Sequence, residues 1–357
     1  MIAYNNAKWV ILATTVLKVE DHMTSIKEVA KKAGVSTATV SAVINQNKYV
    51  SEELRLRIED SIEELNYRPN RVARRLKGKK TNLIGVTVTE LTNPFYPNML
   101  KGIENLAYQQ NYNLILSTTG DDEDKEYRLL ESMLNQGVDG IILSTVDNHE
   151  SNTLKLVEDE NIPYILINRA PAHYNHSMVC VDSIKVGETA TEKLIQLGHE
   201  RISFVGGKRQ NSFDREKGFR KAMNHHGLKI DESLIIDGDY DSNKTYKIAK
   251  KLYELPKDIR PTAIFAASDM MAFAVARGYL DNGAKIPEEI SIIGADNIPF
   301  SKDFRIPLTT VDVQSRNIGR RGFELLNELI KNKGNYSHQQ ILLDPKLIER
   351  SSTLSIL

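Results

Sequence analysis

The chain has 357 residues, of which 41% are hydrophobic and 26% charged, and its formal net charge is zero. This is an ordinary globular composition with enough length for two or three domains. No apolar run approaches the ~20 residues that a membrane-spanning helix needs. The single cysteine, Cys180, excludes an intrachain disulfide and fits a reducing compartment.

The charges are unevenly distributed along the chain. Residues 23–80 carry 13 Lys and Arg against 7 Asp and Glu, a net charge of +6. Residues 1–22 carry two residues of each sign, so the chain from residue 81 onward carries 32 against 38, a net charge of −6. A basic N-terminal part on an acidic remainder indicates that this part meets a polyanion, although a solvated basic face explains the charge equally well.

Residues 1–22 form an extension before the basic part. The apolar stretch 9–17 follows Lys8 and faintly resembles the core of a signal peptide, but no small-residue cleavage site follows it. We expect either that Met23 is the working start of the protein or that residues 1–22 are a loose extension.

Residues 24–66 carry the pattern of three short helices. Apolar residues recur at helical spacing in each of them. Gly34 breaks the first helix, Ser36 is a suitable N-cap for a second helix that begins at Thr37, and Ser51 is a suitable cap for the third. Three helices with a tight turn between the first two match a helix-turn-helix, although three-helix modules that bind proteins share this pattern.

The residues themselves favour DNA. Residues 24–41, which read TSIKEVAKKAGVSTATVS, and residues 65–70, which read LNYRPN, closely resemble the head of the lactose/galactose repressor (LacI/GalR) family. The resemblance extends over about residues 24–355. It implies a helix-turn-helix DNA-binding domain at 23–68 (the head), a hinge at 69–82, and an effector-binding and dimerisation domain at 83–357 (the body).

The resemblance also implies which residues of the head contact DNA. The exposed start of the second helix reads bases, which here means Thr37, Ala38 and Ala42. The sequence departs from the family at Ala42, where arginine is usual, so only an apolar contact, for example to a thymine methyl group, is available there. Hydroxyl groups nearby would contact phosphate and position the head without specifying sequence. These are Ser36, Thr39 and Ser41.

The hinge is short and basic, and by itself it reads as a flexible linker of about two helical turns. In the resembled family this segment becomes a helix on DNA, and a leucine wedges into the minor groove and bends the duplex. Leu76 matches that leucine. The other hinge residues expected at the DNA are Asn70, Arg71 and Arg74.

In the body, short apolar runs alternate with helical patterns, which indicates parallel sheets covered on both faces. The length fits two lobes, and the body resembles type I periplasmic sugar-binding proteins. We expect the first lobe at about 83–182 and 312–345 and the second at about 183–311 and 346–357. The predicted fold class is an all-α helix-turn-helix head followed by an α/β two-lobed body with parallel sheets.

Ligands of open α/β sheets lie beyond the carboxyl ends of the strands. Arginine and carboxylate side chains there suit a hydroxyl-rich ligand, and aromatic rings can stack on a sugar or base. The candidates, which agree with the family's positions, are Asn93, Phe95, Tyr96, Asn168, Arg169, Asp182, Arg215, Ser268 and Asp296. Arg215 and Asp296 could instead form an inter-lobe salt bridge, and Asp269 could bind ligand or simply cap a helix.

Two departures from sugar-binding relatives concern the charge of the ligand. Asn168 stands where an aspartate is frequent, and Ser268 where an asparagine is common. A missing carboxylate beside Arg169 and Arg215 would make the site more positive. We therefore expect a sugar acid or sugar phosphate as effector, with a neutral sugar nearly as well supported.

The main rivals are an enzyme and the solute-binding protein of a transporter. The sequence lacks the nucleophile-elbow, phosphate-loop, dinucleotide-binding and HExxH motifs, so we expect no catalysis and no cofactor. His173, His176, His225 and His226 have no partner at metal-ligand spacing and are expected to be surface residues. A solute-binding protein would leave the basic head unexplained.

Together these features predict a cytoplasmic repressor. One helix-turn-helix head reads one half-site, so a homodimer on a pseudo-palindromic double-stranded operator is expected. Effector binding changes the angle between the lobes and thereby the pairing of the hinges. Release from DNA and recruitment to it are both compatible with the sequence, as is a protein co-regulator.

Overall fold

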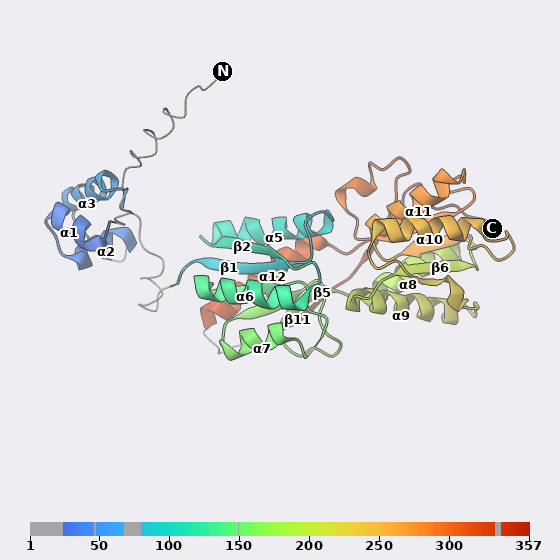
Figure 1. The fold of residues 1–357 in the computed structure, drawn as a ribbon, viewed down its shortest axis with the longest axis horizontal. Coiled ribbons are helices and arrows are strands. Elements are labelled where there is room, and N and C mark those ends of the chain that lie inside the picture. Colours follow the sequence, from blue (N-terminus) through green and yellow to red (C-terminus); the bar gives the residue numbers. More distant parts are fainter. Residues whose placement is uncertain (1–23, 46–47, 68–79, 149, 333–336) are drawn as a thin grey trace, which may run out of the picture. The chain divides into compact units, whose positions relative to one another are not determined.

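The computed structural model describes residues 24–45, 48–67, 80–148, 150–332 and 337–357. The chain divides into two compact units, Met1–Gly78, which contains the head, and Lys79–Leu357, which contains the body (Figure 1). None of the helices within the described ranges has the length and apolar character that crossing a bilayer requires.

The head consists of three helices around a small core, as the apolar pattern predicts. Val29, Val40 and Ile58, one from each helix, are fully buried at its centre. The helices are α1 (Ile26–Ala33), α2 (Thr37–Asn45) and α3 (Glu52–Glu64).

Local interactions define the turn between α1 and α2. Gly34 ends α1 in a left-handed conformation, at φ 65°, which glycine adopts without steric cost. The hydroxyl of Ser36 then accepts the backbone N–H three residues on at 3.1 Å, which confirms Ser36 as the N-cap of α2. Ser51 is the N-cap residue of α3, as predicted, but its side chain makes no cap hydrogen bond. The first turn of α3 instead carries Glu52 and Glu53, whose charges are favourable at a helix N-terminus.

The first lobe of the body is a six-stranded parallel sheet in the order β11-β5-β4-β3-β1-β2 with helices on both faces (Figure 1). Alternate residues of β1 pack on opposite layers: Ile84 and Val86 contact the cluster that includes α5 and α12, and Leu83 the cluster that includes α6 and α7. The strands are β1 (Leu83–Val88), β2 (Asn113–Thr118), β3 (Gly140–Leu143), β4 (Tyr164–Ile167), β5 (Met178–Val181) and β11 (Gln340–Leu343). The helices are α5 (Phe95–Gln109), α6 (Glu123–Gln136), α7 (Asn152–Asp159) and α12 (Ser315–Asn332).

The second lobe repeats this plan, in the order β12-β10-β9-β8-β6-β7. The sheet is parallel, as predicted, except at β12, which runs antiparallel because the chain enters it directly from β11 of the first lobe without a crossover helix. The strands are β6 (Ile202–Gly206), β7 (Ile235–Asp237), β8 (Ala263–Ala266), β9 (Ser291–Ala295), β10 (Thr309–Asp312) and β12 (Lys346–Ile348). The helices are α8 (Ser183–Gln196), α9 (Gln210–His225), α10 (Ser242–Glu254) and α11 (Asp269–Asp281), with 3-10 turns η1 (Glu232–Leu234) and η2 (Pro299–Ser301).

The chain crosses between the lobes three times, after β5 near Asp182, after β10 near Val313 and after β11 near Asp344. Because β5 leaves the first lobe and β10 leaves the second at their carboxyl ends, the carboxyl ends of both parallel sheets face each other across the lobe interface. The strands joined by the crossings, β11 and β5 in one sheet and β12 and β10 in the other, lie at one edge of each sheet.

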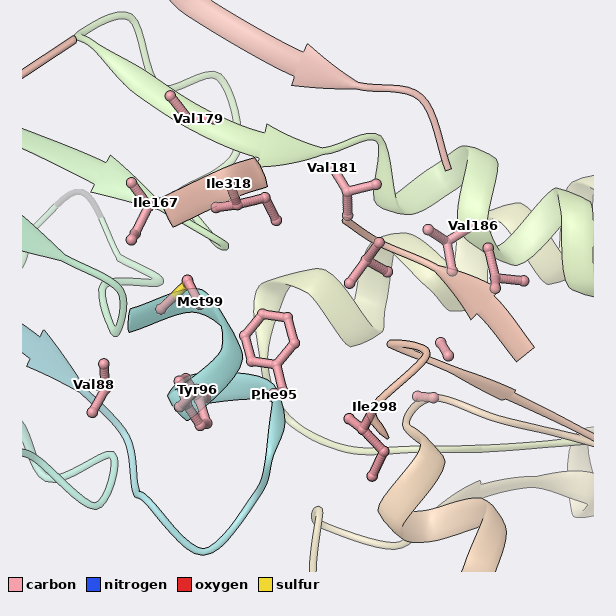
Figure 2. Packing of buried hydrophobic residues seen from close by; sticks show 14 of the residues in the cluster. Val88, Phe95, Tyr96, Met99, Ile167, Val179, Val181, Val186, Ile298 and Ile318 are labelled. Atoms are coloured by element: carbon pink, nitrogen blue, oxygen red, sulfur yellow. The ribbon is translucent and has the colours of Figure 1, made fainter. Parts of the chain in front are cut away.

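Apolar packing continues from one lobe into the other. One cluster of buried residues includes members of both sheets and of the helices α5, α8, α9 and α12. Figure 2 shows Phe95 at the start of α5 on the side that faces Ile298, which follows β9, and Val181 close to the crossing that leads to Val186 of α8. Apolar residues of the two lobes therefore share one packed core.

Paired glycines let two helices approach closely in each lobe. A Cβ at Gly102 of α5 would lie 2.1 Å from the carbonyl oxygen of Arg316, and a Cβ at Gly319 of α12 would lie 2.0 Å from that of Met99. Gly187 of α8 and Gly218 of α9 form the equivalent pair in the second lobe, each with a carbonyl oxygen 2.0 Å from a Cβ position. The obstacle is backbone in all four cases, so a side chain cannot simply rotate away.

We predict that Gly319→Ala strongly destabilises the first lobe, because the new methyl group forces α5 and α12 apart. Overpacking of this kind costs about 1–3 kcal/mol or more. Urea unfolding followed by circular dichroism measures the loss, with Glu104→Ala on the exposed face of α5 as the control. An unchanged midpoint for Gly319→Ala would show that the close approach is not required.

Glu126 is a buried carboxyl group inside the first lobe, only 4% exposed. The hydroxyls of Thr87 and Thr145 both donate to its Oε1. Burial raises the pKa of Glu126, since it outweighs these hydrogen bonds and the attraction of Arg169. The folded state therefore keeps a proton to a higher pH than the unfolded chain does.

This shift predicts a pH dependence of stability. The contribution of Glu126 is complete below its ordinary pKa and is lost as the pH rises through the raised value, so the free energy of unfolding falls over that window. Glu126→Gln, which stays neutral and keeps an acceptor oxygen, should gain stability relative to the natural protein as the pH rises from 5 to 8. Urea unfolding at several pH values tests this, with Glu131→Gln on the exposed face of α6 as control. Parallel pH curves for Glu126→Gln and the natural protein would rule the effect out.

Candidate functional site

The residues of the head that were expected to contact DNA lie at the start and along the length of α2. Ser36, Thr37 and Ala38 are exposed, and Thr39 and Ser41 are half-buried. Helix α2 has no charged residue, so its available contacts are hydroxyl and methyl groups together with the backbone N–H groups of its first turn. Such groups can meet phosphates and thymine methyl groups.

The expectation that Ala42 faces outward is wrong. Its side chain is only 7% exposed. The prediction used only the direction in which Ala42 points from the helix axis. Its methyl group is short, so longer side chains one turn away on the helix cover it. The predicted hinge contacts Asn70, Arg71, Arg74 and Leu76 lie outside the described residues, as does the extension at residues 1–22.

In the body, unusual backbone conformations gather where the two sheets face each other. Left-handed backbone costs energy for residues other than glycine, most of all for a bulky side chain such as Tyr240, and it clusters at functional sites. Seven residues with positive φ follow strands at these facing ends: Asp121, Asn168, Asp239, Tyr240, Asp296, Asn297 and Gln314. These backbone conformations identify the lobe interface as a candidate functional site independently of the sequence motifs.

Arg215 and Asp296 form a buried pair inside the second lobe. Arg215, on α9, is 2% exposed, and its Nη2 lies 3.4 Å from Oδ1 of Asp296. The guanidinium also donates to the carbonyl of Ala267, while its Nε has no partner. Burial raises the pKa of Asp296, although the charge of Arg215 opposes the shift. Because both residues belong to the second lobe, the alternative of an inter-lobe bridge between them is wrong.

Ser268 and Asp269 have structural partners in the same lobe. The hydroxyl of Ser268 accepts the backbone N–H of Met271 at 3.2 Å and caps α11. The carboxylate of Asp269 is fully buried and accepts hydrogen bonds from the backbone of Ile298 at 2.9 Å and from the hydroxyls of Ser301 and Thr310. Ser268 therefore supplies the cap once considered for Asp269, and Asp269 holds the loop after β9.

The predicted residues at the start of α5 are tightly packed. Asn93 Oδ1 accepts the backbone N–H of Phe95 at 3.0 Å, and the hydroxyl of Tyr96 donates to Thr89 Oγ1 at 3.0 Å. The rings of Phe95 and Tyr96 meet edge to face at 5.1 Å between centroids. Both rings are buried, so they form a wall of the lobe interface.

A groove of about 320 Å³ lies between the lobes beside the first crossing. Its lining includes three predicted site residues, Asn168, Arg169 and Asp182, and also Asn211 and Asp214 of α9. Asp182 accepts the backbone N–H of Lys185 at 3.0 Å and so caps α8 as well. The predicted site residues thus fall into three groups in the structure. One group lines the groove beside the first crossing, one lies at the start of α5, and one lies in the interior of the second lobe.

Four residues that sequence reasoning missed complete the lobe interface. Asp121 and Asp147 contact Arg169 of their own lobe, and Arg209 of the second lobe contacts Asp121 and lies 4.1 Å above the ring of Tyr240. Asp121, Asp147 and Tyr240 each come within four residues of the end of a strand, and Arg209 directly precedes α9. Their positions just after a strand or just before a helix were the signal in the sequence that could have identified them.

These carboxylates correct the expected charge of the site. Arg169 was expected to add uncompensated positive charge because position 168 is asparagine. In the structure Asp121 and Asp147 both pair with Arg169, at 2.7 Å in the case of Asp147 Oδ2. With Asp296 beside Arg215, each of the three guanidinium groups, those of Arg169, Arg209 and Arg215, has a carboxylate partner.

The histidines give no indication of a metal site. Across the described ranges no group of three or more His, Cys, Asp or Glu side chains is arranged to hold a metal ion. His173, His225 and His226 are exposed, as expected. His176 is not a free surface residue, because its ring packs 4.5 Å from that of His338.

Comparison with known proteins agrees with both units of the chain. The family described as "Bacterial regulatory proteins, lacI family" matches residues 25–70, and "Periplasmic binding proteins and sugar binding domain of LacI family" matches residues 81–351. The HTH-type transcriptional repressor PurR of Vibrio atlanticus (strain LGP32) is 34% identical over 336 residues, which cover 94% of this chain and 100% of that protein.

Solved structures extend the similarity to three dimensions. The Lac repressor dimer bound to operator and the anti-inducer ONPF has a TM-score of 0.81 at 26% identity and covers 93% of this chain and 99% of its own. A LacI family transcriptional regulator from Enterococcus faecium with bound ribose has a TM-score of 0.69 at 28% identity and covers 77% of this chain and 100% of its own. The chain belongs to the LacI family of DNA-binding transcriptional regulators.

Proposed function

We propose that the protein is a cytoplasmic transcriptional repressor that binds a pseudo-palindromic DNA operator as a homodimer and is controlled by a small molecule bound between its two lobes. The observation that carries this proposal is the combination of units in one chain. A helix-turn-helix head with an exposed start of α2 precedes a body whose polar and charged residues gather where two parallel sheets face each other. This function needs no catalytic residue and no cofactor, and we propose none.

For the DNA contacts, the exposed residues Thr37 and Ala38 are proposed to meet base edges. Ser36, Thr39 and Ser41 would contact phosphate. Ala42 is left out because it is buried. The hinge residues Arg71 and Arg74 would neutralise phosphates, Asn70 would contact the DNA beside them, and Leu76 would enter the minor groove, as the family resemblance implies.

For the effector, a neutral, hydroxyl-rich molecule such as a sugar is better supported than an anion. The pairing of Arg169, Arg209 and Arg215 with carboxylates of the protein supports this choice, because no guanidinium group is left to pair with an anionic ligand. Such paired groups give charge-assisted hydrogen bonds to hydroxyls, and Phe95 and Tyr96 supply apolar rings beside them. The Enterococcus faecium relative was crystallised with ribose, an uncharged sugar.

DNA binding should be specific and steeply dependent on salt. Fluorescence anisotropy with duplexes from the surroundings of the gene is expected to find a site whose affinity falls linearly on a log–log plot against salt concentration, because cationic contacts release counterions. Thr37→Ala should lower affinity for this site by about 1–3 kcal/mol and leave binding to unrelated duplexes unchanged. If a folded dimer binds none of these duplexes at low salt, with or without sugars, the proposed function fails.

The pairing of the three guanidinium groups predicts the ligand preference. In calorimetric titrations with D-ribose and other neutral sugars, compared with sugar acids and sugar phosphates, we expect binding to a neutral sugar. Asp296→Ala should weaken it by about 1.5–3 kcal/mol, since a buried charge-assisted hydrogen bond is lost. Asp237→Asn, on an exposed carboxylate at the end of β7, is the control. Heat of binding with anionic sugars alone would contradict the neutral ligand.

A further inference from the structure

Two carboxylates of the first lobe contact both lobes, with one oxygen atom bound to Arg169 and the other bound to the second lobe. Asp147 Oδ2 lies 2.7 Å from Arg169 Nη1, and its Oδ1 accepts the backbone N–H of Gln210 at 3.2 Å. Asp121 Oδ1 contacts Arg169 Nη2, and its Oδ2 accepts a hydrogen bond from Arg209 Nε at 2.9 Å and lies 2.8 Å from Arg209 Nη2. Arg169 belongs to the first lobe, whereas Arg209 and Gln210 form the start of α9 in the second.

Arg169 is held almost entirely by its own lobe. Its side chain is 1% exposed. Besides the two carboxylates, its Nε donates to the carbonyl of Ser144 and its Nη2 to Thr89 Oγ1, each at 3.2 Å. A guanidinium has five N–H groups, and these contacts use four of them. The geometry therefore gives Arg169 a positioning role, in which it aims both carboxylates at the second lobe.

The partner in the second lobe is also held in place. The guanidinium of Arg209 lies 4.1 Å above the ring of Tyr240, and its side chain is 14% exposed. Tyr240 has a left-handed backbone, and its hydroxyl donates to Asn211 Oδ1 at 3.3 Å. Although burial alone would raise the pKa of Asp121, the charges of Arg169 and Arg209 hold it below its ordinary value. The ion pair is therefore formed at neutral pH.

The contact between Asp121 and Arg209 lies far from the crossings that join the lobes. The crossings join the lobes at the edge formed by β11, β5, β12 and β10. Asp121 follows β2, the strand at the opposite edge of the first sheet, and Arg209 follows β6, which is next to the opposite edge of the second. An opening motion about the crossings would separate Asp121 from Arg209 further than it would separate residues near the crossings.

We infer that Asp121 and Asp147 form a clasp with Arg209 and Gln210 that holds the lobes closed, with the Asp121–Arg209 pair on the side away from the crossings and with Arg169 as the positioning residue. The clasp stabilises one of two lobe arrangements in the absence of any ligand. Its role in regulation rests on the proposed function: an effector that prefers the closed arrangement binds more tightly when the clasp is intact, and one that prefers the open arrangement must break it.

The test measures the distance between the lobes directly, without ligand or DNA. Spin labels are placed at Glu131→Cys on α6 and Lys251→Cys on α10, both exposed, in the full chain carrying Cys180→Ala. Labelled protein is mixed with a large excess of unlabelled protein, so that pulsed electron spin resonance records distances within one protomer. The clasp is removed from either side by Asp121→Asn or Arg209→Gln, and the double variant completes the cycle. Lys208→Gln is the matched control, because Lys208 is exposed and its nearest carboxylate, 4.0 Å away, is Asp237 of its own lobe.

The natural protein and Lys208→Gln should give one dominant short distance. Each clasp variant should add a longer distance and lower the closed-to-open ratio by about two- to fivefold, the range for a partly exposed ion pair. The double variant should open no further than either single variant, because they remove the same contact. Natural distance distributions in both Asp121→Asn and Arg209→Gln would overturn the clasp even if sugar and DNA binding are as proposed, and an equal change in Lys208→Gln would reduce it to a general charge effect.

Discussion

Three chain crossings at one edge of the body are the constraint on which the rest of the structure depends. They turn the carboxyl ends of two parallel sheets toward each other, so that the loops after β2, β3, β4, β7, β9 and β10 converge on one interface. Parallel strands place their functional residues in these loops. The same crossings leave the opposite edge free to separate, which is why an ion pair between Asp121 and Arg209 has consequences there.

Within each lobe the packing resists deformation. The glycine pair Gly102 and Gly319 brings α5 and α12 into backbone contact, and Gly187 and Gly218 do the same for α8 and α9. We therefore expect the two lobes to move relative to each other as rigid bodies, with little change inside either lobe. A small molecule that favours one arrangement shifts a population between two packed states, and the shift can be no larger than its difference in affinity for them.

Much of this could be predicted from the sequence, because periodic apolar residues, the Gly34 turn and the Ser36 cap are local signals. The strand-and-helix alternation of the body was likewise accessible. Contacts between residues that are distant in the chain could not be predicted from the sequence. Arg169 looked unpaired because its neighbour is Asn168, whereas its partners, Asp121 and Asp147, lie 48 and 22 residues away.

In the proposed mechanism, a ligand at the lobe interface and an operator at the head act on the same equilibrium between lobe arrangements. Such coupling is reciprocal: a ligand that changes operator affinity by some factor must have its own affinity changed by the same factor when operator is bound. Titration of one dimeric preparation with a sugar that binds it, with and without saturating operator, and with operator, with and without saturating sugar, gives the two factors. Two equal factors that differ from one are expected. A sugar that binds equally well to free and operator-bound protein would contradict this mechanism.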